Sequence, residues 1–164
     1  MSVDTEDDEI KLTSWSDSDF AANKADRKSI TGGVLTMNGV IVQWICKKQT
    51  GVSLSTMEAE FTSASHVGRE LLGLREMLKE IGLPVTEPMS MLMGNQAAIK
   101  QLECEGSMSS TKHVDVRMKF ICDYAKKGVV KPDFVESKLM KADLLTKTLP
   151  APRVAELRGL FNLV

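Results

Sequence analysis

Histidine and cysteine are scarce in this sequence, and their scarcity restricts its chemistry. Only two histidines are present, His66 and His113, so a histidine base or a histidine-rich metal site has little material. The three cysteines, Cys46, Cys104 and Cys122, are odd in number and form no Cys-x-x-Cys pair, so neither a disulfide framework nor a zinc site is indicated. Scattered cysteines of this kind suit a reducing compartment.

Long apolar runs and a strong net charge are also lacking. No run approaches the roughly 20 apolar residues of a membrane helix, so we expect no membrane partner. The net charge of −1 gives no bulk attraction to nucleic acid or membranes.

The first residues, MSVDTEDDEI, are acidic and contain no apolar signal region. We expect residues 1–10 to be a flexible acidic lead-in and residues 11–164 to form one domain, for which 43% hydrophobic residues supply a core.

The first third of the chain predicts three strands. The run IKLTSWSD at residues 10–17 is typical of a short strand. Two β-rich runs at residues 32–37 and 40–47 flank Asn38-Gly39, and this dipeptide predicts a hairpin because both of its residues accept positive φ. Strands joined by tight turns are antiparallel.

A long amphipathic helix is predicted next. Apolar residues from Met57 to Ile81 recur at spacings of three or four, which places them on one face of a helix. The run STME at residues 55–58 fits a capping box at the helix start. Gly82 and Pro84 are expected to end the helix.

The rest of the chain alternates between strands and helices. We expect strands at residues 89–93 and 129–136, and helices at residues 95–103, 114–125, 139–149 and 155–163. Strands that return through a helix run parallel to their neighbours. The element order therefore predicts an α/β domain with a mixed sheet, whose first three strands are antiparallel and whose faces carry helices.

Three acidic residues in these elements are candidates for a functional role. Asp17 ends the first strand, Glu58 lies in the first turn of the long helix, and Asp143 lies in a late helix. Each has an ordinary interpretation. Asp17 would organise a turn, Glu58 would complete the capping box, and Asp143 would form an ion pair with Lys147, four positions later. Together, and with so few histidines and cysteines, they suit hard cations such as Mg²⁺ or Mn²⁺, the equipment of two-metal phosphodiester hydrolysis.

Five motifs occur in order along the chain: SWSDSDFAANKADRKSITGGV, QWICKKQTGVSLSTMEAEF, GNQAAIKQLE, STKHVDVRMKFI and KADLLTKTLP. Together they resemble the ribonuclease H domain at the end of copia-type (Pseudoviridae) retrotransposon polyproteins, over residues 12–163. The resemblance implies the ribonuclease H-like fold, with a five-stranded mixed sheet flanked by helices. It also implies cleavage of the RNA strand of RNA–DNA hybrids, with two Mg²⁺ or Mn²⁺ ions held by four acids.

The resemblance assigns three of these acids to positions in this chain. SWSDSDFAA matches the family word YSDADWAG at Asp17, and KADLLTK matches the word before the terminal helix at Asp143. STMEAEF matches STTEAEY at Glu58, with Glu60 as the less favoured choice. All three are therefore expected to bind metal and to be catalytic.

The fourth acid is absent. The family word DNQSAI matches GNQAAI at residues 94–99, so Gly94 replaces the aspartate. One alternative is that the glycine serves a tight turn that needs positive φ. We expect a lost metal ligand instead, and therefore little or no ribonuclease H activity, since metal activation and positioning supply much of the acceleration.

Basic residues predominate between residues 112 and 147. We expect four of them to contact hybrid phosphates: Lys112, His113, Arg117 and Lys119. A solvated helix face is an alternative explanation of the same basic run.

The resemblance implies an RNA–DNA hybrid or another nucleic acid as partner, together with the reverse transcriptase portion of a parent polyprotein. The expected location is the cytoplasm, with a retroelement particle or the nucleus as alternatives. The alternative function is a domesticated, non-catalytic module that binds nucleic acid or a protein.

Overall fold

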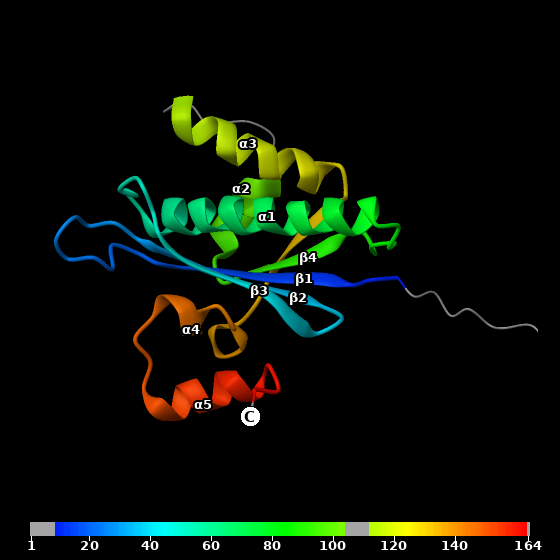
Figure 1. The fold of residues 1–164 in the computed structure, drawn as a ribbon. Coiled ribbons are helices and arrows are strands. Elements are labelled where there is room, and N and C mark those ends of the chain that lie inside the picture. Colours follow the sequence, from blue (N-terminus) through cyan, green and yellow to red (C-terminus); the bar gives the residue numbers. More distant parts are fainter. Residues whose placement is uncertain (1–8, 104–111, 164) are drawn as a thin grey trace, which may run out of the picture.

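The computed structural model describes residues 9–103 and 112–163, and its centre is a five-stranded sheet (Figure 1). The expected lead-in at residues 1–10 lies almost entirely outside the described residues. The strand order is β3-β2-β1-β4-β5, with bounds β1 Leu12–Asp19, β2 Ile30–Met37, β3 Val40–Lys48, β4 Met89–Met93 and β5 Val130–Phe134. The first three strands are antiparallel, whereas β4 runs parallel to both β1 and β5. The predicted mixed sheet is confirmed.

Helices lie on both faces of this sheet (Figure 1). Their bounds are α1 Thr56–Glu80, α2 Gln96–Glu103, α3 Lys112–Lys126, α4 Asp143–Thr146 and α5 Ala151–Gly159, with a 3₁₀ turn at Ser137–Leu139. α1, α2 and α3 cover one face, and α4 and α5 cover the other. The larger core lies under α1 and includes Leu35, Phe61 and Met91. A smaller apolar cluster, which includes Trp15, Val34, Met140 and Phe161, attaches the C-terminal segment to the sheet.

Local sequence signals explain the hairpin and the start of α1. Asn38 and Gly39 have φ of 49° and 83° between β2 and β3, as the Asn-Gly dipeptide predicts. The hydroxyl of Ser55 accepts a hydrogen bond from the Glu58 N–H at 3.1 Å. The Glu58 carboxylate in turn accepts one from the Leu54 N–H at 2.7 Å, which satisfies backbone donors at the helix start.

The C-terminal segment differs from the prediction. The expected helix at residues 139–149 is a 3₁₀ turn followed by the four-residue α4, and the last helix begins at Ala151 rather than at residue 155. Met140 and Ala142 are buried in the smaller apolar cluster, and Met140 adopts an extended backbone that interrupts the helix. Lys147 is also extended, and Pro150 starts the next helix. Tertiary packing therefore overrides the helical spacing here.

The strand register determines where the site forms. Ser16 of β1 is paired with Met93 of the parallel strand β4. Asp17 and Gly94 follow these two residues, so they lie side by side at the carboxyl edge of the sheet. Two neighbouring parallel strands thus bring an acid and a glycine to one place.

Candidate functional site

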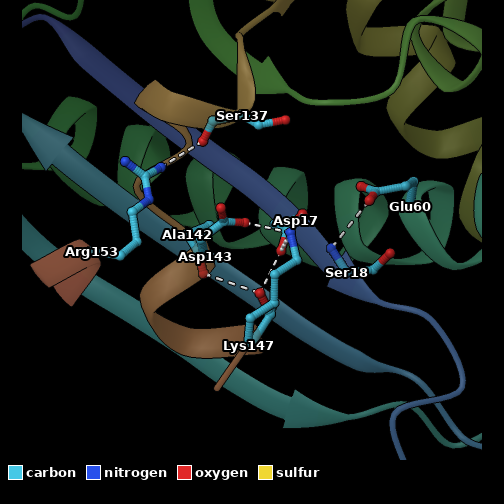
Figure 2. Close-up of polar contacts among 9 residues, drawn as sticks. Asp17, Ser18, Glu60, Ser137, Ala142, Asp143, Lys147 and Arg153 are labelled. Carbon is cyan, nitrogen blue, oxygen red and sulfur yellow. Dashed lines mark hydrogen bonds and ion pairs between the residues drawn. The ribbon is translucent and has the colours of Figure 1, made fainter. Parts of the chain in front are cut away.

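A cavity of about 160 Å³ lies at this edge of the sheet. Residues of β1, α1, the β4–α2 junction and the α4 segment line it, among them Asp17, Glu60, Gly94, Asn95, Asp143 and Lys147. Figure 2 shows Asp17, Asp143 and Lys147 pointing toward one another, with Glu60 approaching from α1. The structure therefore brings together two of the three expected acids, Asp17 and Asp143, with Gly94 beside them.

Asp17 is almost fully buried, with 4% of its surface exposed. The Thr146 hydroxyl donates a hydrogen bond to its carboxylate. Burial raises the pKa of Asp17, and the nearby Asp143 charge adds to this, while the Thr146 hydroxyl and the Lys147 ammonium oppose it. The carboxylate depends on these partners to remain charged.

Glu60 enters the cavity from α1 and is 6% exposed. Its Oε1 accepts a long hydrogen bond of 3.4 Å from the Ser18 N–H, and its Oε2 has no hydrogen-bond partner among the residues that the structure describes. Burial, followed by the negative charge of Asp17, raises the pKa of Glu60 to about 7. A buried acid with a free oxygen and a shifted pKa is typical of a functional site.

The geometry favours Glu60 over Glu58 as the second acid of the expected site. Glu58 is only half-buried, and its carboxylate is used in the capping box with Leu54. Residues two positions apart lie about 200° apart around a helix, so Glu58 and Glu60 cannot both face the sheet. The motif STMEAEF contains both glutamates, and the structure places the second of them, Glu60, in the cavity.

Lys147 connects the acids of β1 and α4. Its ammonium nitrogen lies 2.5 Å from Oδ1 of Asp143 and 3.2 Å from Oδ2 of Asp17 (Figure 2). Burial lowers the pKa of Lys147, but the hydrogen bond to Asp143 and the two negative charges outweigh it, so the pKa is raised. The expected ion pair between Asp143 and Lys147 is confirmed, whereas the second contact, with Asp17, has no signal in the local sequence.

Gly94 does not need to be a glycine for reasons of backbone conformation. Its φ lies outside the left-handed region, which Gly39, Gly82 and Gly128 occupy among the described residues. A Cβ atom at Gly94 would meet only the Cε atom of Met140, at 3.5 Å. The alternative of a tight turn with positive φ is therefore wrong. The following Asn95 is not a substitute ligand, because its side chain accepts a hydrogen bond from the Ala98 N–H and caps α2.

The acidic side chains in the cavity have the oxygen ligands that a hard divalent cation prefers. They are not, however, grouped closely enough to surround a metal ion. Asp17, Glu60 and Asp143 supply carboxylate oxygens, which Mg²⁺ and Mn²⁺ prefer, and Oε2 of Glu60 is free to bind. Yet within residues 9–103 and 112–163, no three acidic, histidine or cysteine side chains are grouped closely enough to hold a metal ion. In this arrangement the Lys147 ammonium forms ion pairs with Asp17 and Asp143.

The expected phosphate contacts fall on the first half of α3. The side chains of Lys112, His113 and Arg117 lie outside the described residues, and Lys119 is exposed. These contacts therefore stay a prediction. No helix in the described parts of the chain has the length and apolar character to cross a membrane.

Solved structures identify the fold. The chain is similar to the ribonuclease H1 LC11 isolated from compost, with a TM-score of 0.60 and 12% identity over 85% of this chain and 93% of that one. LC11 ribonuclease H1 in complex with an RNA/DNA hybrid gives a TM-score of 0.58 and 14% identity, over 83% and 94% of the two chains. The protein therefore has the ribonuclease H-like fold.

Sequence relatives give a narrower identification. No family model matches, but the chain is 34% identical over 139 residues to the retrovirus-related Pol polyprotein from transposon TNT 1-94 of Nicotiana tabacum. It is 30% identical over 146 residues to that from transposon RE2 of Arabidopsis thaliana. These matches cover 85% and 89% of the chain and about a tenth of each polyprotein. The chain belongs to the family of ribonuclease H domains of copia-type retrotransposon polyproteins.

Proposed function

We propose that this domain binds RNA–DNA hybrids and has little or no ability to cut their RNA strand. The observation that supports the proposal is the position of Gly94. It lies beside Asp17 at the carboxyl edge of the sheet, in the same cavity as Glu60 and Asp143. The site in this proposal thus has three acids and one position without a ligand, Gly94, where the family word DNQSAI that the chain resembles has an aspartate.

Each retained acid has a defined part in this proposal. Asp17, Glu60 and Asp143 would hold Mg²⁺ or Mn²⁺, and Thr146 and Lys147 orient the Asp17 carboxylate. Bound metal ions supply an activated water and stabilise the leaving oxygen in phosphodiester hydrolysis. Without a carboxylate at position 94, this chain has fewer fixed negative charges for two divalent ions and a phosphate, so cleavage is impaired.

The hybrid is the proposed nucleic acid for two reasons. A structural neighbour, LC11 ribonuclease H1, is known in complex with an RNA/DNA hybrid. The cavity opens at the carboxyl edge of a mixed sheet, where ligands of α/β proteins commonly bind. The chain corresponds to about a tenth of its polyprotein relatives, so we propose the reverse transcriptase portion of a parent polyprotein as its protein partner.

Hybrid cleavage by matched variants tests the proposal. The unmodified chain, Gly94→Asp and Gly94→Asn are incubated with an RNA–DNA hybrid labelled on the RNA strand, in Mg²⁺ and separately in Mn²⁺. We expect cleavage only from Gly94→Asp, because Gly94→Asn supplies similar volume without the charge. Efficient cleavage by the unmodified chain would refute the proposed impairment, and no cleavage by any variant would refute the assignment of the site.

The second candidate is a domesticated module that binds a protein partner in place of a hybrid, and the Lys147 contacts favour it. Lys147 neutralises part of the acidic cluster, which leaves less negative charge in the cavity for a metal ion. Fluorescence anisotropy distinguishes the hybrid-binding domain from the protein-binding module. It measures the affinity for a labelled RNA–DNA hybrid over a range of salt concentrations. A nucleic-acid-binding domain loses affinity steeply with salt because binding releases counterions. A domain that serves only as a protein partner shows no hybrid affinity at low salt.

A further inference from the structure

Lys147 contacts two carboxylates that come from opposite ends of the chain. Its ammonium nitrogen is 2.5 Å from Asp143 and 3.2 Å from Asp17, whose side chains are only 9% and 6% exposed. Among the residues that the structure describes, it is the cationic side chain that lines the cavity. A positive charge is therefore already present on two of the three acids proposed to hold a metal.

The backbone around Lys147 is arranged to maintain this contact. α4 ends at Thr146, whose hydroxyl donates to Asp17. Lys147 then adopts φ −120° and ψ 146°, an extended conformation that brings its side chain back over the start of α4. The segment approaches closely because β2 has a glycine there: a Cβ atom on Gly32 would lie 2.3 Å from Cγ2 of Thr146.

The lysine side chain can also leave the site. It is 40% exposed, in contrast to the two carboxylates that it contacts. A lysine side chain has several rotatable bonds and a strongly hydrated ammonium group, so moving it into solvent does not require the backbone to move. The two buried carboxylates have no such freedom and need a cation to replace the one that departs.

We propose that Lys147 is a built-in counter-ion that competes with divalent metal for Asp17 and Asp143. It is a positioning residue: it holds the two carboxylates together when no metal is bound, and a metal that uses both of them must displace it. The inference rests on the proposed function, since it concerns the same acids. It predicts a domain that folds without metal and binds divalent ions weakly.

Lys147→Met is the test variant, because methionine keeps much of the side-chain length and removes the charge. The matched control is Lys138→Met, which removes an exposed lysine whose ammonium lies 3.0 Å from the exposed carboxylate of Glu136. Mn²⁺ binding is measured by electron paramagnetic resonance of the free ion, without nucleic acid, and thermal unfolding is recorded in chelator and with added Mn²⁺. These readouts do not depend on cleavage.

We expect Lys147→Met to unfold at a lower temperature than the unmodified chain in chelator, since two buried carboxylates lose their counter-charge. We expect its Mn²⁺ affinity to be about tenfold higher, the effect of one partly buried ion pair, and added Mn²⁺ to restore its stability. The control should match the unmodified chain in both measurements. A purely structural lysine would give the same loss of stability with no gain in Mn²⁺ affinity, and this result would overturn the proposal.

Lys147→Arg keeps the proposal testable if the methionine variant does not fold. Arginine retains the charge and can bind carboxylates through two N–H groups, so this variant should bind Mn²⁺ no more tightly than the unmodified chain. Tighter binding by Lys147→Arg would contradict competition. If no variant binds Mn²⁺, including Gly94→Asp, the proposed metal function fails together with this inference. Equal binding by all variants removes only the role of Lys147.

Discussion

Gly94 faces Cε of Met140 at a distance that leaves room for a side chain: a Cβ atom added at position 94 would lie 3.5 Å from it, an ordinary van der Waals distance. The position therefore accepts a side chain without rearrangement. We predict that Gly94→Ala changes the free energy of unfolding by no more than about 0.5 kcal/mol, as expected where no special backbone or packing feature is lost. Urea unfolding of the two proteins in chelator measures this difference.

Gly94→Asp should behave differently in chelator and in Mn²⁺. In chelator the new carboxylate lies near Asp17 and destabilises the fold, because like charges at short range repel in a partly buried site. In Mn²⁺ we expect this loss to be reversed and the melting temperature to rise above that of Gly94→Ala. A melting temperature that is unaffected by Mn²⁺ would contradict the assignment of position 94 to the metal site.

Glu60 should make stability depend on pH. Its pKa is about 7 in the folded protein and near 4.5 when unperturbed. A raised pKa in an acid means that the unfolded state ionises first, so stability falls as pH rises from about 4.5 to about 7 and the loss is complete above that range. At about 1.4 kcal/mol for each pH unit, the full loss is about 3 kcal/mol.

Glu60→Gln isolates this contribution. The amide is similar in shape, can still accept from Ser18 N–H, and does not titrate. We predict that the stability difference between Glu60→Gln and the unmodified chain, measured in chelator, moves in favour of the variant between pH 4.5 and 7.5. Two stability curves that stay parallel across this range would show that Glu60 is ionised as easily in the folded protein as in the unfolded one.

Gly32 should be required for the docking of α4. A Cβ atom there would lie 2.3 Å from Cγ2 of Thr146 and 3.1 Å from the carbonyl oxygen of Ala142. We predict that Gly32→Ala lowers the free energy of unfolding by about 1–3 kcal/mol, typical of overpacking. Gly73→Ala is the matched control: a Cβ atom on this glycine of α1 meets nothing within 4 Å, so helix propensity should make it neutral or stabilising by up to about 1 kcal/mol.

Gln49 should hold the first turns of α1 against the sheet. Its amide nitrogen lies 3.0 Å from the Ala59 carbonyl oxygen, 3.2 Å from Oγ1 of Thr31 and 3.3 Å from Oγ of Ser63, all in the interior. Gln49→Ala leaves these buried groups with fewer partners, so we predict a loss of about 2–4 kcal/mol. Gln43→Ala, which removes one half-buried contact with Glu70, should cost less than about 1 kcal/mol.

Much of the fold could be predicted from the sequence because its signals are local. The hairpin at Asn38 and the capping box at Ser55 depend on residues within four positions, and both are confirmed. The periodicity of α1 reflects a single buried face. The segment at residues 139–149 was predicted wrongly, because its apolar residues follow a helical spacing while the burial of Met140 against the sheet determines the backbone.

The site was only partly predictable for a similar reason. Motif order pointed to Asp17, Asp143 and position 94, and the structure places all three in the lining of one cavity. The choice between Glu58 and Glu60 depends on which side of α1 faces β1, and this is a property of packing rather than of the motif. The contact of Lys147 with Asp17 joins residues 130 positions apart, so no local pattern could indicate it.

The separation of these partners also has a consequence during synthesis. Asp17 belongs to the central strand, while Thr146 and Lys147, which hold its carboxylate, are translated 129 and 130 codons later. A nascent chain can therefore complete all five strands while Asp17 still lacks these partners. A copy of the gene interrupted by a stop codon between the end of β5 and α4 would encode the whole sheet with an unpaired carboxylate on its central strand.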